Sequence, residues 1–268
     1  VASSRVATMA TNGPGGTPHL VGERCAHRDT QLSVGWIEGD SIRCFYHGWK
    51  YDCSGQCVEQ PAEPKPFAET MRIPSYPVQE YLGLIFAYLG AGEPPPLNRF
   101  PKFENPQCVV DAIRFDRICN YYGNIENSLD NVHVRFVHSR HRDSVRDHAA
   151  TGDPVIKVEE SDWGVRRYAG YPNGTESVFF FGMPNINYII GQVVDQDVKR
   201  VESLIFKVPV DDDKHLHFEA RLMPFSGAKG EEWLQRRRAQ REKETADRLD
   251  LVRAVLRGGL RLDDIHPG

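Results

Sequence analysis

Apolar residues in the first ninety positions fall in short runs rather than at helical spacing. Residues 18–21, 41–44 and 84–88 are runs of strand length, separated by glycine, proline and asparagine. Such runs between turn residues are typical of β-strands, and no helical periodicity of useful length accompanies them. We therefore predict that the chain begins with an all-β domain.

A proline-rich stretch ends this pattern. Residues 92–96 read Gly-Glu-Pro-Pro-Pro, and Pro101 and Pro106 follow. This composition favours a stiff, extended connector. We place the domain boundary in it, which predicts one domain over residues 1–100 and a second over residues 101–268.

The second domain mixes both periodicities, which predicts an α+β fold. Residues 120–136 are expected to be helical, and residues 155–220 to form strands with turns at 172–174 and 211–213. A long amphipathic helix is predicted over residues 231–256, with Leu249, Val252 and Leu256 as its apolar stripe. The glycines at 258 and 259 would end it.

Composition narrows the class of protein. Hydrophobic residues make up 40% and charged residues 26% of the chain, and the longest apolar run, residues 81–88, is too short to cross a bilayer. A formal net charge of -4 gives no reason to expect nucleic acid or an anionic membrane as a partner. Six cysteines are too few for a disulfide scaffold, so we expect a cytoplasmic protein. The start at Val1 and the abrupt end at Gly268 lead us to expect further sequence at both ends.

Two short motifs near the start each combine a cysteine with a histidine. Cys25-Ala-His27 and Cys44-Phe-Tyr-His47 are separated by sixteen residues. A [2Fe–2S] cluster with two cysteines on one iron and two histidines on the other needs this set of ligands. The alternative is a structural Cys2His2 zinc site, but zinc fingers usually pair cysteine with cysteine and histidine with histidine. Cys53 and Cys57 follow closely and are possible further ligands, although four are already supplied.

A second group of candidate ligands lies in the middle of the chain. Asn127, Asp130 and His133 are spaced by three residues, which would stack them along one face of a helix. His138 would lie about 140° around an ideal helix from His133, so both can bind one metal only if the helix breaks or bulges near residues 135–137. Two histidines and one carboxylate leave open positions for dioxygen in non-haem Fe(II) oxygenases. Histidines without a metal are the alternative.

The sequence around both groups resembles Rieske non-haem iron aromatic-ring-hydroxylating oxygenase α subunits. Residues 24–28 (Arg-Cys-Ala-His-Arg) and 44–52 (Cys-Phe-Tyr-His-Gly-Trp-Lys-Tyr-Asp) look like the two cluster-binding loops of a Rieske domain, and the likeness extends over residues 18–90. Residues 126–138 fit N-x2-D-x2-H-x4-H, which is similar to the motif of the catalytic domain. Within this family the chain looks like the phthalate-dioxygenase-like and aryl O-demethylase group.

This resemblance implies a fold and a set of site residues. An all-β Rieske domain would precede an α+β catalytic domain of helix-grip, START-like fold that is incomplete at its C-terminus. The implied ligands of the [2Fe–2S] cluster are Cys25, His27, Cys44 and His47. The implied residues of the mononuclear Fe(II) site are the ligands His133 and His138, the neighbouring Asn127, and Asp130, which would bridge His133 to the partner subunit's His47.

The third iron ligand is the point where this sequence departs from the family. Family members carry a late carboxylate in a stretch resembling Ile-Gln-Asp, and no such stretch occurs here. We expect the carboxylate to lie beyond Gly268. Asp263 or Asp264 is the alternative.

The resemblance also implies an activity and its partners. The protein would be a terminal oxygenase that uses dioxygen to hydroxylate or O-demethylate a small aromatic acid or methoxy-aromatic substrate. Electrons would come from NAD(P)H through a ferredoxin or flavin reductase, because this chain has no nucleotide-binding glycine motif after a strand. The Asp130 bridge requires a ring of subunits, and a homotrimer is implied.

Several alternatives stay open at this point. The chain could be a Rieske electron-transfer protein with an inactive second domain. It could also be a Rieske oxygenase of a sterol, an amine or an alkaloid, because metal motifs do not report the substrate. Residues 179–190 are rich in aromatic and apolar side chains, and they either line a substrate pocket or face the core.

Overall fold

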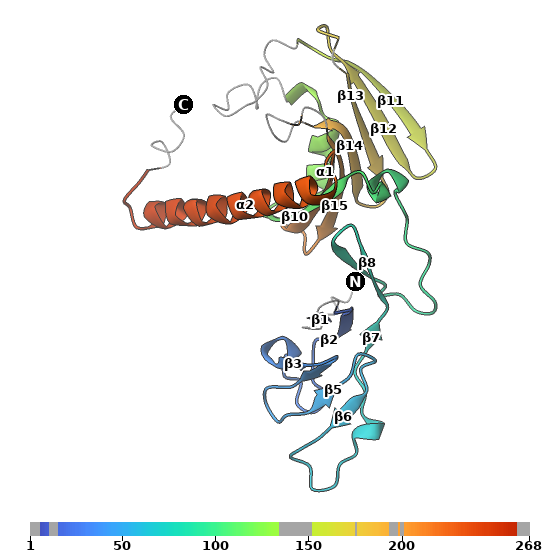
Figure 1. The fold of residues 1–268 in the computed structure, drawn as a ribbon, viewed down its shortest axis with the longest axis vertical. Helices are drawn as coiled ribbons and strands as arrows, with labels where there is room; N and C mark the ends of the chain where they lie inside the picture. The colour runs from blue at the N-terminus through green and yellow to red at the C-terminus, as the bar shows by residue number, and fades with distance from the viewer. Residues whose placement is uncertain are drawn as a thin grey trace. The chain divides into compact units, whose positions relative to one another are not determined.

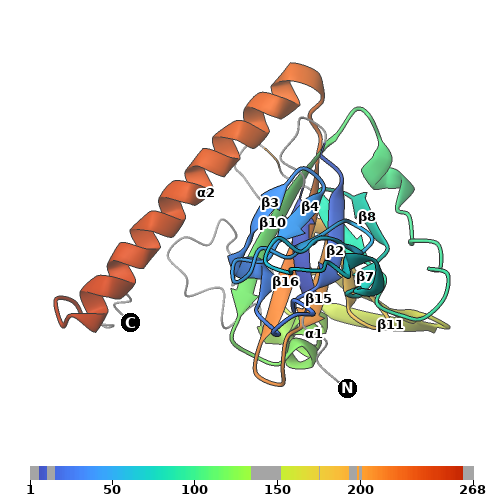
Figure 2. The same ribbon diagram turned by 90° about the horizontal axis from the view of Figure 1, so that it is seen from below.

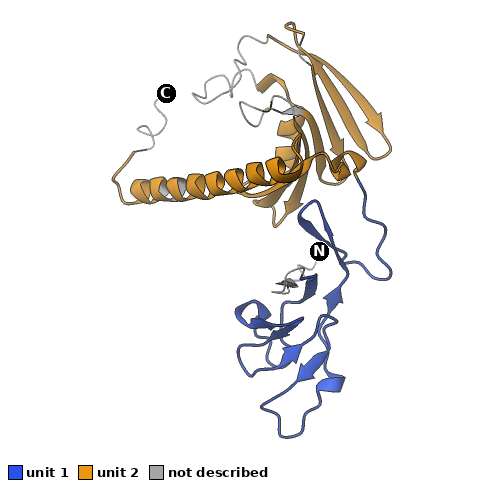
Figure 3. Cartoon of the chain, in the orientation of Figure 1, with its two compact units in different colours: residues 1–99 blue, residues 100–268 orange. Residues whose placement is uncertain are grey.

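The computed structural model describes residues 6–10, 16–133, 152–174, 176–192, 198 and 201–261. The chain divides into two compact units, Val1–Arg99 and Phe100–Gly268 (Figure 3). No helix in these described stretches is long and apolar enough to cross a membrane.

Unit 1 consists of short antiparallel strands. One sheet contains β1 (Val6–Ala10), β2 (Pro18–Gly22) and β7 (Ser75–Tyr76), and a second contains β3 (Trp36–Glu38), β4 (Ser41–Arg43), β5 (Lys50–Tyr51) and β6 (Cys57–Glu59) (Figure 1). A separate hairpin contains β8 (Val78–Tyr81) and β9 (Leu84–Ala87). The predicted strands at residues 18–21, 41–44 and 84–88 are confirmed to within a residue at each end.

The core of unit 1 is small and partly made of thiols. Its buried members are Val21, Cys25, Leu32, Ile42, Cys44, Trp49, Tyr51, Cys57 and Ile73. Cysteine behaves as a small hydrophobe when it is buried. The two cysteines of the predicted cluster motifs therefore belong to the packed interior of this unit.

Unit 2 contains one antiparallel sheet and two helices. Its seven described strands lie in the order β10-β16-β15-β14-β13-β12-β11. Their bounds are β10 Val109–Arg117, β11 Val155–Ser161, β12 Gly164–Gly170, β13 Glu176–Gly182, β14 Ile186–Gln192, β15 Val201–Pro209 and β16 His215–Met223. A short 3-10 turn (Pro101–Glu104) precedes the sheet, and the helices are α1 (Tyr121–Leu129) and α2 (Gly227–Leu256).

Both helices cover the same face of the sheet. Phe179 and Phe181 of β13 pack with Ile125 of α1, and Met223 of β16 packs with Trp233 of α2. The strand register places Phe179, Phe181 and Met223 on one face, because side chains alternate between faces along each strand. The predicted α+β fold is confirmed by this sheet with helices on one side.

Helix α1 is shorter than predicted. It begins after Asn120, whose Oδ1 accepts a hydrogen bond from the Tyr122 N–H (2.9 Å), which is a typical N-cap. It ends at Leu129, because Asp130 has an extended backbone (φ -80°, ψ 122°). The prediction of one continuous helix to residue 136 is therefore wrong at Asp130.

Helix α2 ends at the predicted residue but begins four residues earlier than predicted, and its packing differs from the prediction. Trp233 and Arg241 contact the sheet, whereas Leu256 of the predicted apolar stripe is 81% exposed. The side chains of Leu249 and Val252 lie outside the described residues. The second half of the helix extends away from the sheet (Figures 1 and 2). The predicted apolar stripe is therefore wrong at Leu256. The residues that dock α2 on the sheet lie in the first half of the helix.

A buried ion pair fixes α2 to the sheet. Both Nη atoms of Arg241 donate to the two carboxylate oxygens of Asp111 in β10, at 2.7 and 2.8 Å. Asp111 is only 1% exposed, so Arg241 is the partner that compensates its buried negative charge. A carboxylate that is buried without a partner is strongly destabilising.

We expect Arg241→Met to lower the free energy of unfolding of unit 2 by about 3–5 kcal/mol, because Asp111 then keeps an uncompensated charge. The thermal unfolding midpoint measures this. The double variant Arg241→Met/Asp111→Leu should recover most of the loss. If the single variant unfolds like the parent protein, the ion pair does not hold the helix.

Candidate metal centres

The two predicted cluster loops share one backbone geometry. In each, the cysteine N–H donates to the carbonyl five residues later, at 2.9 Å for Cys25 and 2.8 Å for Cys44. The N–H four residues after the cysteine donates back to the cysteine carbonyl, at 3.0 and 3.1 Å. That fourth position has a positive φ in both loops, 56° at Asp29 and 75° at Gly48. Glycine and aspartate are residue types that accept this conformation.

The loops bring the predicted ligands together. The ring centroids of His27 and His47 lie 4.6 Å apart, and Cys25 and Cys44 are both buried. The Nδ1 atoms of both histidines are buried and have no hydrogen-bond partner among the described residues. Buried polar atoms nearly always have partners. Two unpartnered imidazole nitrogens beside two buried thiols therefore fit the ligand set of a [2Fe–2S] cluster.

The composition of the loops favours this cluster over a zinc site. Each loop supplies one cysteine and one histidine, whereas structural zinc fingers usually pair cysteine with cysteine and histidine with histidine.

Tyr51 lies behind the first loop. Its hydroxyl oxygen accepts a hydrogen bond from the Ala26 N–H (3.0 Å) and lies 3.2 Å from Cys25 Sγ. A thiolate can only accept, so Tyr51 would donate its proton to Cys25 in the metal-bound state. Burial raises the pKa of the Cys25 thiol, the Tyr51 hydroxyl opposes this, and the Cys44 thiol adds to it.

Trp49 orients the histidine of the first loop. Its ring stacks on His27 with centroids 4.7 Å apart and an angle of 6° between the planes. Trp49 is 1% exposed, so the surface that supports the imidazole is itself fixed by packing. This contact holds the His27 ring plane.

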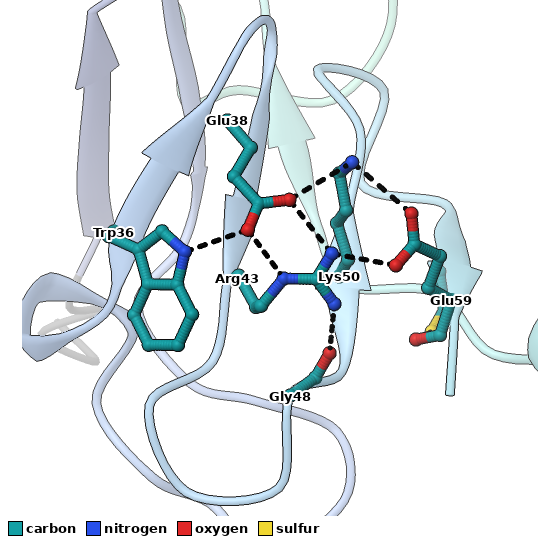
Figure 4. A network of polar contacts seen from close by, with 7 residues as sticks. Trp36, Glu38, Arg43, Gly48, Lys50 and Glu59 are labelled. Carbon is teal, nitrogen blue, oxygen red and sulfur yellow. Dashed lines mark hydrogen bonds and ion pairs between the residues drawn. The ribbon is translucent and has the colours of Figure 1, made fainter. Parts of the chain in front are cut away.

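A network of four charged side chains holds the second loop (Figure 4). Arg43 donates to both carboxylate oxygens of Glu38 (2.7 and 2.8 Å) and to Glu59 (2.6 Å). Lys50 lies 3.2 Å from Glu38 and 3.3 Å from Glu59. The remaining Nη1 of Arg43 donates to the Gly48 carbonyl (2.8 Å), directly after the predicted ligand of this loop. The network thus connects the strands of the sheet to the loop.

The second predicted site is only partly described. Asp130 Oδ1 accepts from the Val132 N–H (2.8 Å), and its Oδ2 lies 3.3 Å from His133 Nδ1. Asn127 is exposed on α1, and the predicted stack of three residues on one helix face is wrong because the helix ends before Asp130. His138, Asp263 and Asp264, and the expected break near residues 135–137, lie outside the described residues.

The local contacts also determine the ionisation of Asp130. Burial alone would raise its pKa, but the Val132 N–H and the His133 ring outweigh this and lower the pKa below its usual value. An ionised carboxylate next to a histidine nitrogen fixes the orientation and tautomer of the ring.

Sequence reasoning missed the residue that positions α1. Lys207 of β15 is 1% exposed, and its ammonium donates to the Asn124 carbonyl (2.6 Å) and to Ser128 Oγ (2.7 Å). Burial, assisted by the Arg117 charge, lowers the pKa of Lys207 to about 7. The indication of this role is that Lys207 occupies a position on the same strand face as Ile205, where an apolar residue is expected.

The aromatic segment at residues 179–190 contributes to the core. Phe179 and Phe181 are buried against Ile125, and Phe180 packs on the opposite face with Trp163 at 4.5 Å between centroids. Of the two alternatives for this segment, a substrate pocket or the core, Phe179 and Phe181 therefore belong to the core.

Comparison with known proteins identifies unit 1. A family model described as the Rieske [2Fe-2S] domain matches residues 4–77. Residues 4–77 form a Rieske domain. The loops, the paired imidazoles and the thiol-containing core described above all lie within its bounds.

The Rieske domain and the residues after it have relatives among oxygenases. The chain is 35% identical to the oxygenase subunit of 3-chlorobenzoate-3,4-dioxygenase from Comamonas testosteroni, over 61% of this chain and 40% of that protein. It is 32% identical to the oxygenase subunit of 5,5'-dehydrodivanillate O-demethylase from Sphingobium sp. strain SYK-6, over 54% and 36%. The chain thus spans about two fifths of the length of these curated relatives.

A solved structure shares the fold of most of the chain. The terminal oxygenase of carbazole 1,9a-dioxygenase from Nocardioides aromaticivorans IC177 superposes with a TM-score of 0.64 at 19% identity, covering 92% of this chain and 77% of that one. Over this length the chain therefore shares the fold of that terminal oxygenase, in unit 2 as well as in the Rieske domain. The resemblance inferred from the motifs is confirmed for the domain, its homologues and the fold.

We expect Tyr51→Phe to lower the reduction potential of the cluster in the full-length protein. A hydrogen bond to a ligating sulfur stabilises the more negative, reduced state, so its loss should shift the potential by about 40 mV for each ~1 kcal/mol involved. A redox titration followed by EPR measures this. Tyr76→Phe, in β7, is the matched control. An unchanged potential in Tyr51→Phe would contradict the proposed hydrogen bond.

We expect Arg43→Met to accelerate loss of the cluster, because the Cys44 loop loses its anchor at the Gly48 carbonyl. One lost hydrogen bond of ~1 kcal/mol corresponds to about a fivefold faster rate. Bleaching of the visible absorption in the presence of a chelator measures it. Arg28→Met removes the same charge from an exposed position beside His27, and should bleach at the parental rate. Equal rates for the two variants would refute the anchoring role.

Proposed function

We propose that the full-length protein is the terminal oxygenase component of a cytoplasmic Rieske non-haem iron system. It takes electrons from NAD(P)H through a ferredoxin or flavin reductase, uses dioxygen, and hydroxylates or O-demethylates a small aromatic acid or methoxy-aromatic compound. The observation that carries the proposal is the pair of unpartnered histidine nitrogens in a Rieske domain that precedes an oxygenase fold.

Each metal has a proposed set of residues. The cluster ligands are Cys25 and Cys44 on one iron and the Nδ1 atoms of His27 and His47 on the other. The mononuclear iron ligands are His133, His138 and a late carboxylate, which is Asp263, Asp264 or a residue beyond Gly268. When bound, the cluster stores an electron and the mononuclear iron activates dioxygen.

The residues of this chain orient the second metal site. Asp130 Oδ2 would accept a hydrogen bond from His133 Nδ1–H, which would leave Nε2 as the metal-binding atom of that ring. Lys207 fixes α1, and hence the position of Asp130 at its end, through two hydrogen bonds. In a homotrimer, Asp130 would also bind the partner subunit's His47, and Asn127 would lie beside the metal.

The substrate class follows from relatives. The two relatives compared above are named for a chlorobenzoate and for a dehydrodivanillate. An aromatic acid or a methoxy-aromatic compound is therefore the proposed substrate.

Turnover by the full-length protein tests this function. Aryl ethers and aromatic acids are supplied with NADH and a surrogate reductase, and product formation is scored together with iron content. An oxygenase should hold three irons per chain and form product. Two irons per chain without product would instead indicate an electron-transfer protein, and three irons without turnover of any of these compounds would refute the substrate class.

We expect Asp130→Asn to retain iron at both sites but to reduce turnover by about 10- to 100-fold, because the amide no longer fixes the His133 ring and the bridge. Asp116→Asn, which changes an exposed carboxylate of β10, should turn over normally. Iron analysis and initial rates measure both. Normal turnover in Asp130→Asn would remove the bridge from the mechanism.

A further inference from the structure

Arg167 is a buried cation whose donors lack acceptors. It lies in the middle of β12, on the face of the sheet that the helices cover, and is 5% exposed. Its Nε and Nη1 atoms, which carry three of its five N–H groups, find no hydrogen-bond partner in the described part of the chain. The residue before it, Arg166, is exposed on the other face and bonds to Tyr168 (3.2 Å).

A guanidinium that is buried without acceptors destabilises the folded state. A buried charge normally has a hydrogen-bonded partner of opposite charge, because desolvation otherwise destabilises the fold by several kcal/mol. Arginine does not escape this cost by losing its proton. Buried polar groups that stay unpartnered therefore indicate a group that binds from outside the chain.

The neighbouring side chains do not supply that partner. Asp130 is close enough for its charge to act on Arg167, but its two oxygens bond to the Val132 N–H and approach His133. The Tyr171 hydroxyl accepts a hydrogen bond from the Asn131 amide (2.8 Å). An anion that reaches Arg167 from outside the chain would supply acceptors for these donors and compensate the buried charge.

The rest of the surroundings are apolar and aromatic. The Arg167 guanidinium lies 5.4 Å from the ring centroid of Phe179, the residue opposite it in the strand register. Phe179 forms a buried cluster with Phe181 and Ile125, against which Leu129 packs at the end of α1. A flat hydrocarbon ring would thus meet apolar side chains, while a carboxylate attached to it would meet a cation.

We propose that Arg167 binds the carboxylate of an aromatic acid, whose ring lies beside the partly buried Leu129 and next to Asp130 and His133. This rests on the proposed oxygenase function and narrows its substrate class from aromatic acids and methoxy-aromatic compounds to aromatic carboxylates. Arg167 is a specificity-determining residue, because a neutral methoxy-aromatic compound would leave its charge uncompensated.

Binding of benzoate and 3-chlorobenzoate to the full-length, metal-loaded protein tests this, with benzamide as the neutral analogue of benzoate. Calorimetry without reductase or dioxygen should show both carboxylates binding about tenfold or more tightly than benzamide. Arg167→Met should weaken benzoate binding by about tenfold or more and leave benzamide binding unchanged. Arg166→Met removes the same charge one residue earlier and should bind both ligands like the parent protein.

Thermal unfolding separates a binding role from a structural one. Without ligand, Arg167→Met should unfold at or above the parental temperature, because it removes an uncompensated buried charge. Benzoate should raise the unfolding temperature of the parent protein and of Arg166→Met, but not of Arg167→Met. If Arg167→Met lowers the unfolding temperature strongly, or if benzoate and benzamide bind the parent protein equally, the proposal is overturned.

The calorimetry and the unfolding measurements test the anion site separately from catalytic turnover. Benzoate binding through Arg167 in a protein that holds two irons per chain and oxidises nothing would support the anion site and refute the oxygenase. Turnover of neutral aryl ethers, with no preference for carboxylates, would support the oxygenase and refute the anion site.

Discussion

The closure of two loops by backbone hydrogen bonds is the constraint on which the Rieske domain depends. Each loop satisfies the amide and the carbonyl of its own cysteine, so both cysteines can be buried without unpaired backbone groups. The positive φ at Asp29 and Gly48 makes these turns possible. Trp49 and Tyr51 follow the second loop in sequence and then support the first, through His27 and Cys25. The first loop therefore depends on residues that follow the second loop in sequence.

Much of this domain could be predicted from sequence, because local patterns determine it. Short apolar runs between turn residues gave strands at residues 18–21, 41–44 and 84–88, and two Cys/His motifs gave the candidate ligands. The supporting contacts were not predictable. Tyr51 and Arg43 act on groups 26 and 5 residues away, and only the folded register brings their polar atoms to those groups. The spacing of residues in the sequence indicates which side chains can bind a metal, but not which contacts keep those side chains in position.

Unit 2 shows where the periodicity of apolar residues is insufficient to predict the structure. A helix was expected to continue to residue 136, but the Asp130 carboxylate bonds to the next turn and the backbone becomes extended. This is the competition between side chain and backbone that makes aspartate a poor residue inside helices. The covered face of the sheet also departs from a simple apolar pattern, since Asp111, Arg167 and Lys207 are buried there. Two of them hold helices in place, which no alternation of polar and apolar residues indicates.

The adjacent arginines of β12 have a consequence for the folding of this sheet. Arg166 and Arg167 point to opposite faces, so a slip of one residue in strand pairing would exchange them. The exchanged arrangement would bury Arg166, expose Arg167 and shift the three consecutive phenylalanines of β13 relative to their partners. Because the two arginine side chains are identical, this pair does not by itself distinguish the two registers. The distinction falls to uncharged neighbours such as Ala169, which is 1% exposed and lies on the same face as Arg167.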